Sequence, residues 1–211
     1  MGSGSRPKRS AVRTVSRPRV CSIAAPLLLV TTALEDAGVP QQLFGSVPDV
    51  IVLGVFGHAN RTDAARSRAG SEPVIDLRST SGATVEGEGS EAVTTVSLGR
   101  VPGERTGTRE IAAQIAEVIE HIGASTVAMS LGLGGADHLE ASDAALLARR
   151  RTRRRVRWIV YSDGDPAADA GRVARRRMLL LVRGIRLEPV VVAEAPMGST
   201  VRYWEIRAAD R

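Results

Sequence analysis

The segment with the clearest chemical potential is Leu131-Gly-Leu-Gly-Gly-Ala-Asp-His138, which follows a predicted strand and leads into a predicted helix. Glycines let the backbone approach a ligand closely, and the free amides at the start of a helix favour an anion. Ligands of open α/β sheets bind at the carboxyl ends of the strands. Asp137 and His138 are therefore candidates to line a crevice. The alternative is a plain strand-to-helix turn that Asp137 caps.

Two more carboxylates follow the next predicted strand. Asp163 and Asp165 suit acid–base work or a hard cation. Gly164 and Pro166 favour a surface turn instead. Nucleophilic catalysis has little support, because the chain has no Gly-x-Ser-x-Gly elbow. Cys21 lies in an apolar run, where a thiolate is disfavoured.

The elements that position these residues alternate along the chain. Continuous apolar runs at 49–56, 125–130 and 156–161 are typical of buried parallel strands. Residues 108–122 form the clearest amphipathic helix, which Thr108 can cap and Gly123 can end. Further helices are predicted over about 138–150 and 167–183, and further strands over 91–98, 189–193 and 201–206. This alternation predicts an α/β fold with a doubly wound, mostly parallel, Rossmann-like sheet and helices on both faces.

The segments around the glycine-rich loop resemble a known enzyme family. Residues 130–139, followed by Asp143-Ala-Ala-Leu146, are similar to the second signature of the PIG-L/LmbE-like zinc N-deacetylases. That signature typically reads Pro-Leu-Gly-x-Gly-Gly-His-x-Asp-His, with an Asp-Ala pair further along the helix. Tyr161-Ser-Asp-Gly-Asp-Pro166 resembles the Tyr-x-Asp-x-Pro segment of the same relatives, and residues 50–60 resemble the strand after their first motif. The resemblance keeps its order over roughly residues 20–195.

What the resemblance implies is a damaged zinc site. These deacetylases hold zinc with a His and an Asp from an early Pro-His-x-Asp-Asp motif and a His from the second signature. Aligned on Pro26, the early motif places Leu27 at the ligand His, Leu29 at the general base and Val30 at the ligand Asp. In the second signature His138 matches the remaining ligand, Asp137 is its neighbour, and Ala136 replaces the oxyanion-stabilising His. A catalytic zinc needs about three protein ligands.

The first hypothesis is therefore a divergent deacetylase-fold protein, catalytically impaired or a pseudoenzyme, which needs no cofactor. Its crevice would keep a small sugar-like or N-acylated metabolite, with Gly134, Gly135 and Asp163 as the ligand-binding residues. The second hypothesis is an active metal-dependent N-deacetylase with rebuilt zinc ligands, His58 and His138, and Asp137 as the catalytic residue. This hypothesis requires His58 to lie beside His138. His58 is otherwise a polar loop residue, and His121 needs no functional role at the end of its helix.

Arginine dominates the charge. Lysine and arginine number 29, the net charge is +6, and residues 149–155 hold six arginines in seven positions. With Arg175-Arg-Arg177, this run suggests a third hypothesis, a basic nucleic-acid-binding accessory protein. No nucleic-acid-binding motif accompanies it, and two tryptophans and two tyrosines offer little stacking surface. A solvated basic surface is the simpler interpretation.

Length and composition set the organisation. The 211 residues predict a basic disordered arm over 1–20 and a single domain over 21–211. The apolar run 20–34 is too short to span a membrane. It predicts either a first buried strand at 23–30 or a secretory signal. The strand interpretation, with one cysteine in the chain, favours a cytoplasmic protein; the oligomeric state stays open.

Overall fold

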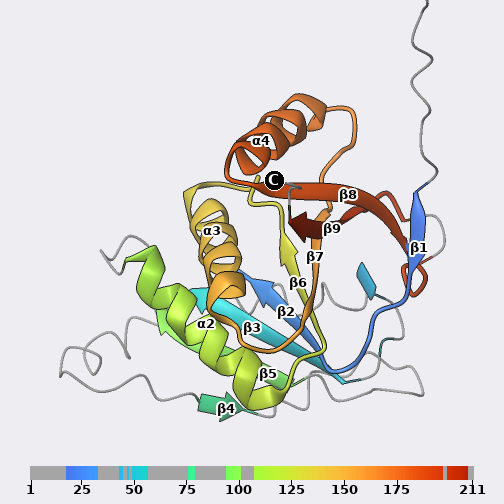
Figure 1. Cartoon of the computed structure of the whole chain (residues 1–211). Coiled ribbons are helices and arrows are strands. Elements are labelled where there is room, and N and C mark those ends of the chain that lie inside the picture. Colours follow the sequence, from blue (N-terminus) through green and yellow to red (C-terminus); the bar gives the residue numbers. More distant parts are fainter. Residues whose placement is uncertain are drawn as a thin grey trace, which may run out of the picture.

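Apolar runs of leucine, isoleucine and valine form the strands of one sheet in the computed structural model, and helices pack against this sheet (Figure 1). The structure describes residues 18–32, 43–44, 47, 49–56, 76–78, 94–100, 107–196 and 199–208. Within them the strands are β1 (Arg19–Cys21), β2 (Leu27–Thr31), β3 (Val50–Phe56), β4 (Asp76–Arg78), β5 (Thr94–Arg100), β6 (Thr126–Ser130), β7 (Arg157–Ser162), β8 (Ile185–Val192) and β9 (Arg202–Ala208). The helices are α2 (Thr108–Ile122), α3 (Ala136–Arg151) and α4 (Ala170–Val182).

The sheet is mixed, with the strand order β1-β8-β9-β7-β6-β2-β3-β5-β4. Strand β2 pairs in parallel with β3 and β6, β6 with β7, β3 with β5, and β1 with β8. Strand β9 runs antiparallel to β7 and β8, and β4 runs antiparallel to β5. The connection over residues 193–201 is shorter than the dozen or so residues of a crossover, so β9 must return antiparallel to β8. The predicted α/β fold is confirmed.

The order of the central strands creates a switch point. From β2 the chain moves to β3 and β5 on one side, then returns through α2 to β6 and β7 on the other side. The connections that leave the carboxyl ends of β2 and β6 therefore diverge. In open α/β sheets this divergence opens the crevice in which ligands bind.

Both faces of the sheet are buried. In β2, Leu28 and Val30 belong to one core cluster, and Leu27 and Leu29 belong to another on the opposite face. Helices α2, α3 and α4 all contribute to the first cluster. The second cluster contains Phe44, whose ring packs edge-on against Tyr161. A central strand buried on both faces must be apolar throughout.

Helices α2 and α3 lie side by side over the sheet (Figure 1). The predicted helix 108–122 is confirmed with these bounds, because its isoleucines repeat at helical spacing and it ends at Gly123. No side chain caps its start, so the predicted role of Thr108 is wrong. The buried face of α3 is made largely of alanines, which let neighbouring elements approach closely.

The N-terminal part of the chain differs in detail from the predicted elements. The apolar run 20–34 contributes to two strands, β1 and β2, and β1 takes in Arg19 and Val20 of the predicted arm. Residues 1–17 of that arm lie outside the described residues. The predicted strand at 91–98 corresponds to β5, which begins at Thr94, and the short strand β4 was not predicted. No helix in the described part of the chain is long and apolar enough to cross a membrane.

Candidate functional site

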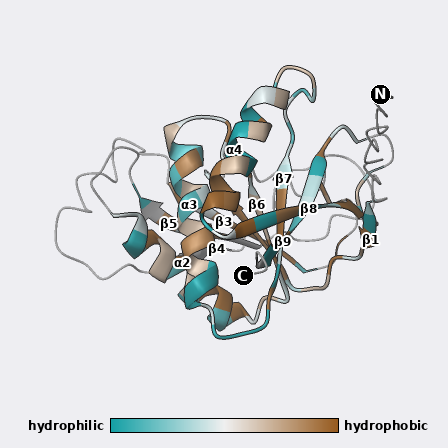
Figure 2. Ribbon diagram, turned by 45° about the horizontal axis from the view of Figure 1, so that its top comes forward, coloured by the Kyte–Doolittle hydropathy of each residue, from teal (hydrophilic) through white to brown (hydrophobic). Residues whose placement is uncertain are grey.

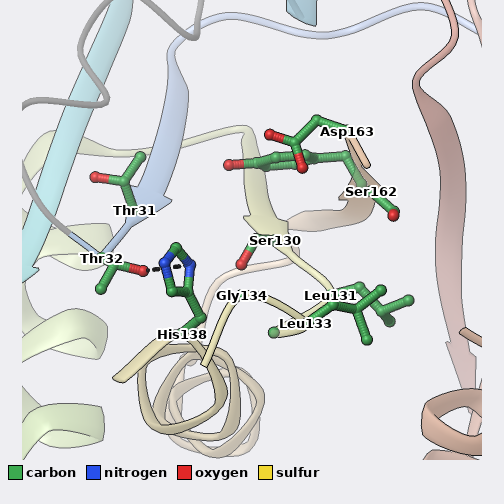
Figure 3. A pocket seen from close by; sticks show the side chains of 11 residues that line it. Thr31, Thr32, Ser130, Leu131, Leu133, Gly134, His138, Ser162 and Asp163 are labelled. Atoms are coloured by element: carbon green, nitrogen blue, oxygen red, sulfur yellow. Dashed lines mark hydrogen bonds between the residues drawn. The ribbon is translucent and has the colours of Figure 1, made fainter. Parts of the chain in front are cut away.

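A cavity opens at the switch point, where β2, β6 and β7 end (Figure 3). Its volume is about 120 Å³. Five hydroxyl-bearing side chains from the three strand ends line it, together with the glycine-rich loop and the start of α3. The lining residues are Thr31, Thr32, Ser130, Leu131, Gly132, Leu133, Gly134, His138, Tyr161, Ser162 and Asp163. The cavity therefore lies where the fold predicts a ligand.

His138 is held by a residue far away in the sequence. It stands in the first turn of α3, half-buried, and its Nδ1 shares a hydrogen bond of 2.9 Å with the Thr32 hydroxyl (Figure 3). A hydrogen bond at one ring nitrogen fixes the ring orientation and so defines where the other nitrogen lies. Thr32 thus presets the imidazole for contact with a ligand.

The glycine-rich loop allows His138 to sit so close. A Cβ atom at Gly134 would lie 2.7 Å from His138 Cδ2 and 2.9 Å from Nε2. Only a residue without a side chain leaves the imidazole in this position. Gly134 is therefore needed for the position of the His138 ring, in addition to any role in the turn.

Arg176 supports the loop from behind. This α4 side chain is 6% exposed and donates from Nε to the Leu131 carbonyl at 3.2 Å. Its terminal nitrogen donates to Ser142 Oγ at 3.3 Å and to Asp143 Oδ1 at 2.6 Å. One planar guanidinium therefore ties the start of the loop to α3.

The predicted site residues divide into three groups. His138, Gly134 and Asp163 line the cavity. Asp137 and Gly135 do not line it: Gly135 is the N-cap of α3, and Asp137 follows it in the first turn. His58 lies outside the described residues. Asp165 accepts a hydrogen bond from the backbone N–H of Ala167 at 2.8 Å, as the surface-turn interpretation requires.

Leu27, Leu29 and Val30 do not occupy the carboxyl end of β2, where the cavity opens. They are buried inside β2 and paired on both sides, to β3 and β6. The sheet requires them to be apolar, so their identity is not a sign of an erased site. The residues that β2 brings to the cavity are Thr31 and Thr32.

A zinc ion is the cofactor that the resemblance implies, and its ligand requirements can be compared with this lining. The cavity side chains include one imidazole and one carboxylate, those of His138 and Asp163. Among the described residues, no three His, Cys, Asp or Glu side chains cluster so as to hold a metal. Because a catalytic zinc takes about three protein ligands, these residues by themselves do not fit one.

Cys21 and two of the clustered arginines, Arg176 and Arg177, make contacts within the fold. Burial raises the pKa of the Cys21 thiol, as expected for an unreactive cysteine. Arg176 is not available to a phosphate, because it is buried on Asp143, and Arg177 lies over the Trp204 ring. The hypothesis of one basic cluster at Arg175–Arg177 is therefore wrong for its middle residue.

The hydroxyls of Thr32, Ser130 and Ser162 were not identified as site residues from the sequence. Each lies at or just beyond the end of a strand. A polar residue that ends an otherwise apolar run is a pattern that would have indicated all three, since parallel strands end at the same edge of a sheet.

We expect Gly134→Ala to weaken ligand binding in the cavity by roughly tenfold or more, because its Cβ would displace the His138 ring. The matched control is Gly135→Ala, whose Cβ would meet nothing within 4 Å. Calorimetric titration of both variants with the same ligand measures the difference. Equal affinities for the two variants would contradict the proposed contact.

Comparison with known proteins gives two similar solved structures. No family model matches the chain, and no curated protein matches it. A deacetylase triple mutant from the teicoplanin biosynthetic pathway is 14% identical, with 87% of this chain and 98% of that chain covered and a TM-score of 0.43. The pseudoaglycone deacetylase Dbv21 is 14% identical, with 88% and 98% covered and a TM-score of 0.39.

Proposed function

We propose that the protein is a deacetylase-like domain that binds a small sugar-like or N-acylated molecule in the cavity beside His138, without efficient hydrolysis. The observation that carries the proposal is the ring of groups around the imidazole. Its nearest polar partner is the Thr32 hydroxyl at 2.9 Å, and Ser130 and Ser162 line the same cavity. Hydroxyls donate and accept hydrogen bonds, which suits the hydroxyls and amide of such a ligand.

The size of the cavity limits the part of the ligand that enters it. Its volume of about 120 Å³ is below the ~300–1,000 Å³ of pockets that enclose whole drug-sized ligands. A single acyl group or part of one sugar ring matches this space. Asp163, exposed at the rim, is placed to accept a hydrogen bond from the portion that stays outside.

The proposal includes the finer fold description, a doubly wound, Rossmann-like arrangement around β2, and a cytoplasmic location. The parallel pairings of β2, β3, β6 and β7 support the first. The lone cysteine supports the second, because secreted domains of this size often carry disulfides.

A second candidate function is an active zinc N-deacetylase. The observation that favours it is the fixed orientation of His138, since metal-ligating histidines almost always hydrogen-bond through their other ring nitrogen. The remaining zinc ligands would come from residues outside the described part of the chain. His58 is the histidine among those residues.

The test measures ligand binding, zinc content and hydrolysis on the full-length chain. We expect N-acetylglucosamine to bind, and His138→Ala to weaken its binding by roughly tenfold, about 1.4 kcal/mol. His121→Ala is the control, because His121 is exposed at the end of α2. We expect no release of free amine, with or without added zinc.

The outcomes separate the candidates. Stoichiometric zinc after purification, with hydrolysis that His138→Ala removes, establishes the second function and rejects the first. Failure of N-acetylated and free amino sugars to bind, or equal behaviour of the two histidine variants, contradicts a ligand site at His138.

A further inference from the structure

Helix α4 exposes a patch of large apolar side chains in its C-terminal half. Met178 is 63% exposed, Leu179 52%, Leu181 49% and Val182 80%, and among these five consecutive positions only Leu180 is buried. This half of the helix is coloured as hydrophobic in Figure 2. Contiguous exposed apolar side chains are uncommon on soluble domains and mark contact surfaces. We call these four exposed residues the α4 apolar patch.

The patch continues into a groove between α4 and β8. The groove has a volume of about 290 Å³ and is lined mainly by aliphatic side chains. Its lining residues are Ala174, Arg177, Met178, Leu181, Ile185, Arg186 and Leu187. An aliphatic groove next to an exposed aliphatic patch suits a hydrocarbon chain.

Positive charge surrounds the patch. Arg175, Arg177, Arg183 and Arg186 are all exposed, and the first turn of α4 has no acidic residue. The end of α3 lies against the end of α4, because Arg150 donates to the Arg183 carbonyl at 3.3 Å. Arg150 of the arginine run therefore adjoins the same surface. The nearby carboxylates of Asp143 and Asp169 are already paired with arginines.

We propose that the α4 apolar patch and its arginines dock on the surface of an anionic lipid bilayer. Interfacial helices combine an inserted apolar face with arginine or lysine at the headgroup level. Each basic residue near an anionic membrane contributes an attraction, and the long arginine side chains reach the headgroups while aliphatic groups insert.

The same features argue against two other occupants. A two-fold contact brings the same patch of both copies together, so the arginines around one patch would lie near those around the other. Single-stranded nucleic acid is bound through aromatic stacking, and the four residues of the patch are all aliphatic.

The test is co-sedimentation of the full-length protein with vesicles of phosphatidylcholine, alone or containing phosphatidylglycerol. We expect binding to the anionic vesicles that falls with added salt, and weak binding to the neutral ones. The double variant Leu179→Gln, Val182→Gln is expected to lower binding by at least roughly tenfold, because two exposed side chains lose their transfer into the bilayer. Arg175→Glu is expected to lower it by roughly tenfold as well.

Two matched controls are Val20→Gln, at another exposed apolar residue, and Arg109→Glu, at an exposed residue of α2. Both are expected to bind vesicles as the unaltered protein does, and thermal unfolding shows that all variants are folded. Vesicle binding by the double variant equal to that of the controls overturns the proposal. A dimer that the double variant abolishes, or RNA binding that only Arg175→Glu abolishes, without vesicle binding, also overturns it.

Discussion

Arg176→Met is expected to lower the free energy of unfolding by about 3 kcal/mol. The guanidinium is 6% exposed and bonds the Leu131 carbonyl, Ser142 and Asp143. Methionine would fill similar space but leave the carbonyl and the carboxylate without this donor. The Asp143 side chain is 26% exposed and keeps Arg183 as a partner, so the loss stays near the lower end of the range for broken buried pairs.

The control for this variant is its neighbour. Arg175→Met replaces an exposed arginine on the same helix and is expected to change stability by less than about 0.5 kcal/mol. Urea unfolding followed by circular dichroism gives both values. Similar losses in the two variants would show that Arg176 does not carry the bonds that hold the loop. Arg176→Lys is expected to recover only part of the loss, since an ammonium lacks the planar fork.

Gly132→Ala is expected to cost about 3 kcal/mol for two reasons that add. Gly132 has φ +79°, a conformation that side chains strain. Its Cβ would also lie 2.9 Å from Ser142 Cβ, 3.1 Å from the His138 carbonyl oxygen and 3.2 Å from Leu139 Cα. Two of these atoms are helix backbone, so α3 must shift to make room.

Replacing Gly171 is expected to have the opposite effect on stability. A Cβ at Gly171, near the start of α4, would meet nothing within 4 Å, so Gly171→Ala is expected to raise stability by up to about 0.5 kcal/mol through helix propensity. Thermal unfolding of the two variants compares them directly. A Gly132→Ala protein as stable as the unaltered one would mean that the loop adopts another path. Because α3 carries His138, we expect this variant to lose ligand binding as well.

Arg176→Met and Gly132→Ala both change contacts that support the walls of the cavity, and neither replaces a side chain that would touch the ligand. The loop at 131–135 is fixed on one side by Arg176 and on the other by its close contact with α3. His138 then meets Thr32 from the end of β2. Ligand binding near His138 depends on this whole arrangement, so stability and affinity are expected to fall together in Arg176→Met and Gly132→Ala. In Gly134→Ala only affinity is expected to fall.

The local pattern of the sequence was sufficient for most of the elements. The isoleucines of α2 repeat at helical spacing, and the continuous apolar runs at β3, β6 and β7 are typical of buried strands. The alternation of elements by itself indicated a mostly parallel sheet and so missed the antiparallel direction of β9, which the short connection over 193–201 imposes. The polar end of β2 at Thr31 and Thr32 is less distinct than the other strand ends, since threonine is itself enriched in strands. The correspondence of Leu27, Leu29 and Val30 to zinc ligands rests on the alignment at Pro26, which lies ahead of β2 and not at its carboxyl end.

What the sequence by itself determined is therefore the set of strands and helices, an α/β fold, and the glycine-rich loop that ends at His138. These depend on neighbouring residues, which periodicity and turn chemistry report directly. Only the tertiary structure decided what surrounds His138. Thr32 is 106 residues away along the chain, and Arg176 reaches Leu131 across 45. Such contacts follow from the strand order and the packing of α4, because side chains distant in sequence meet only when the sheet brings them to one edge.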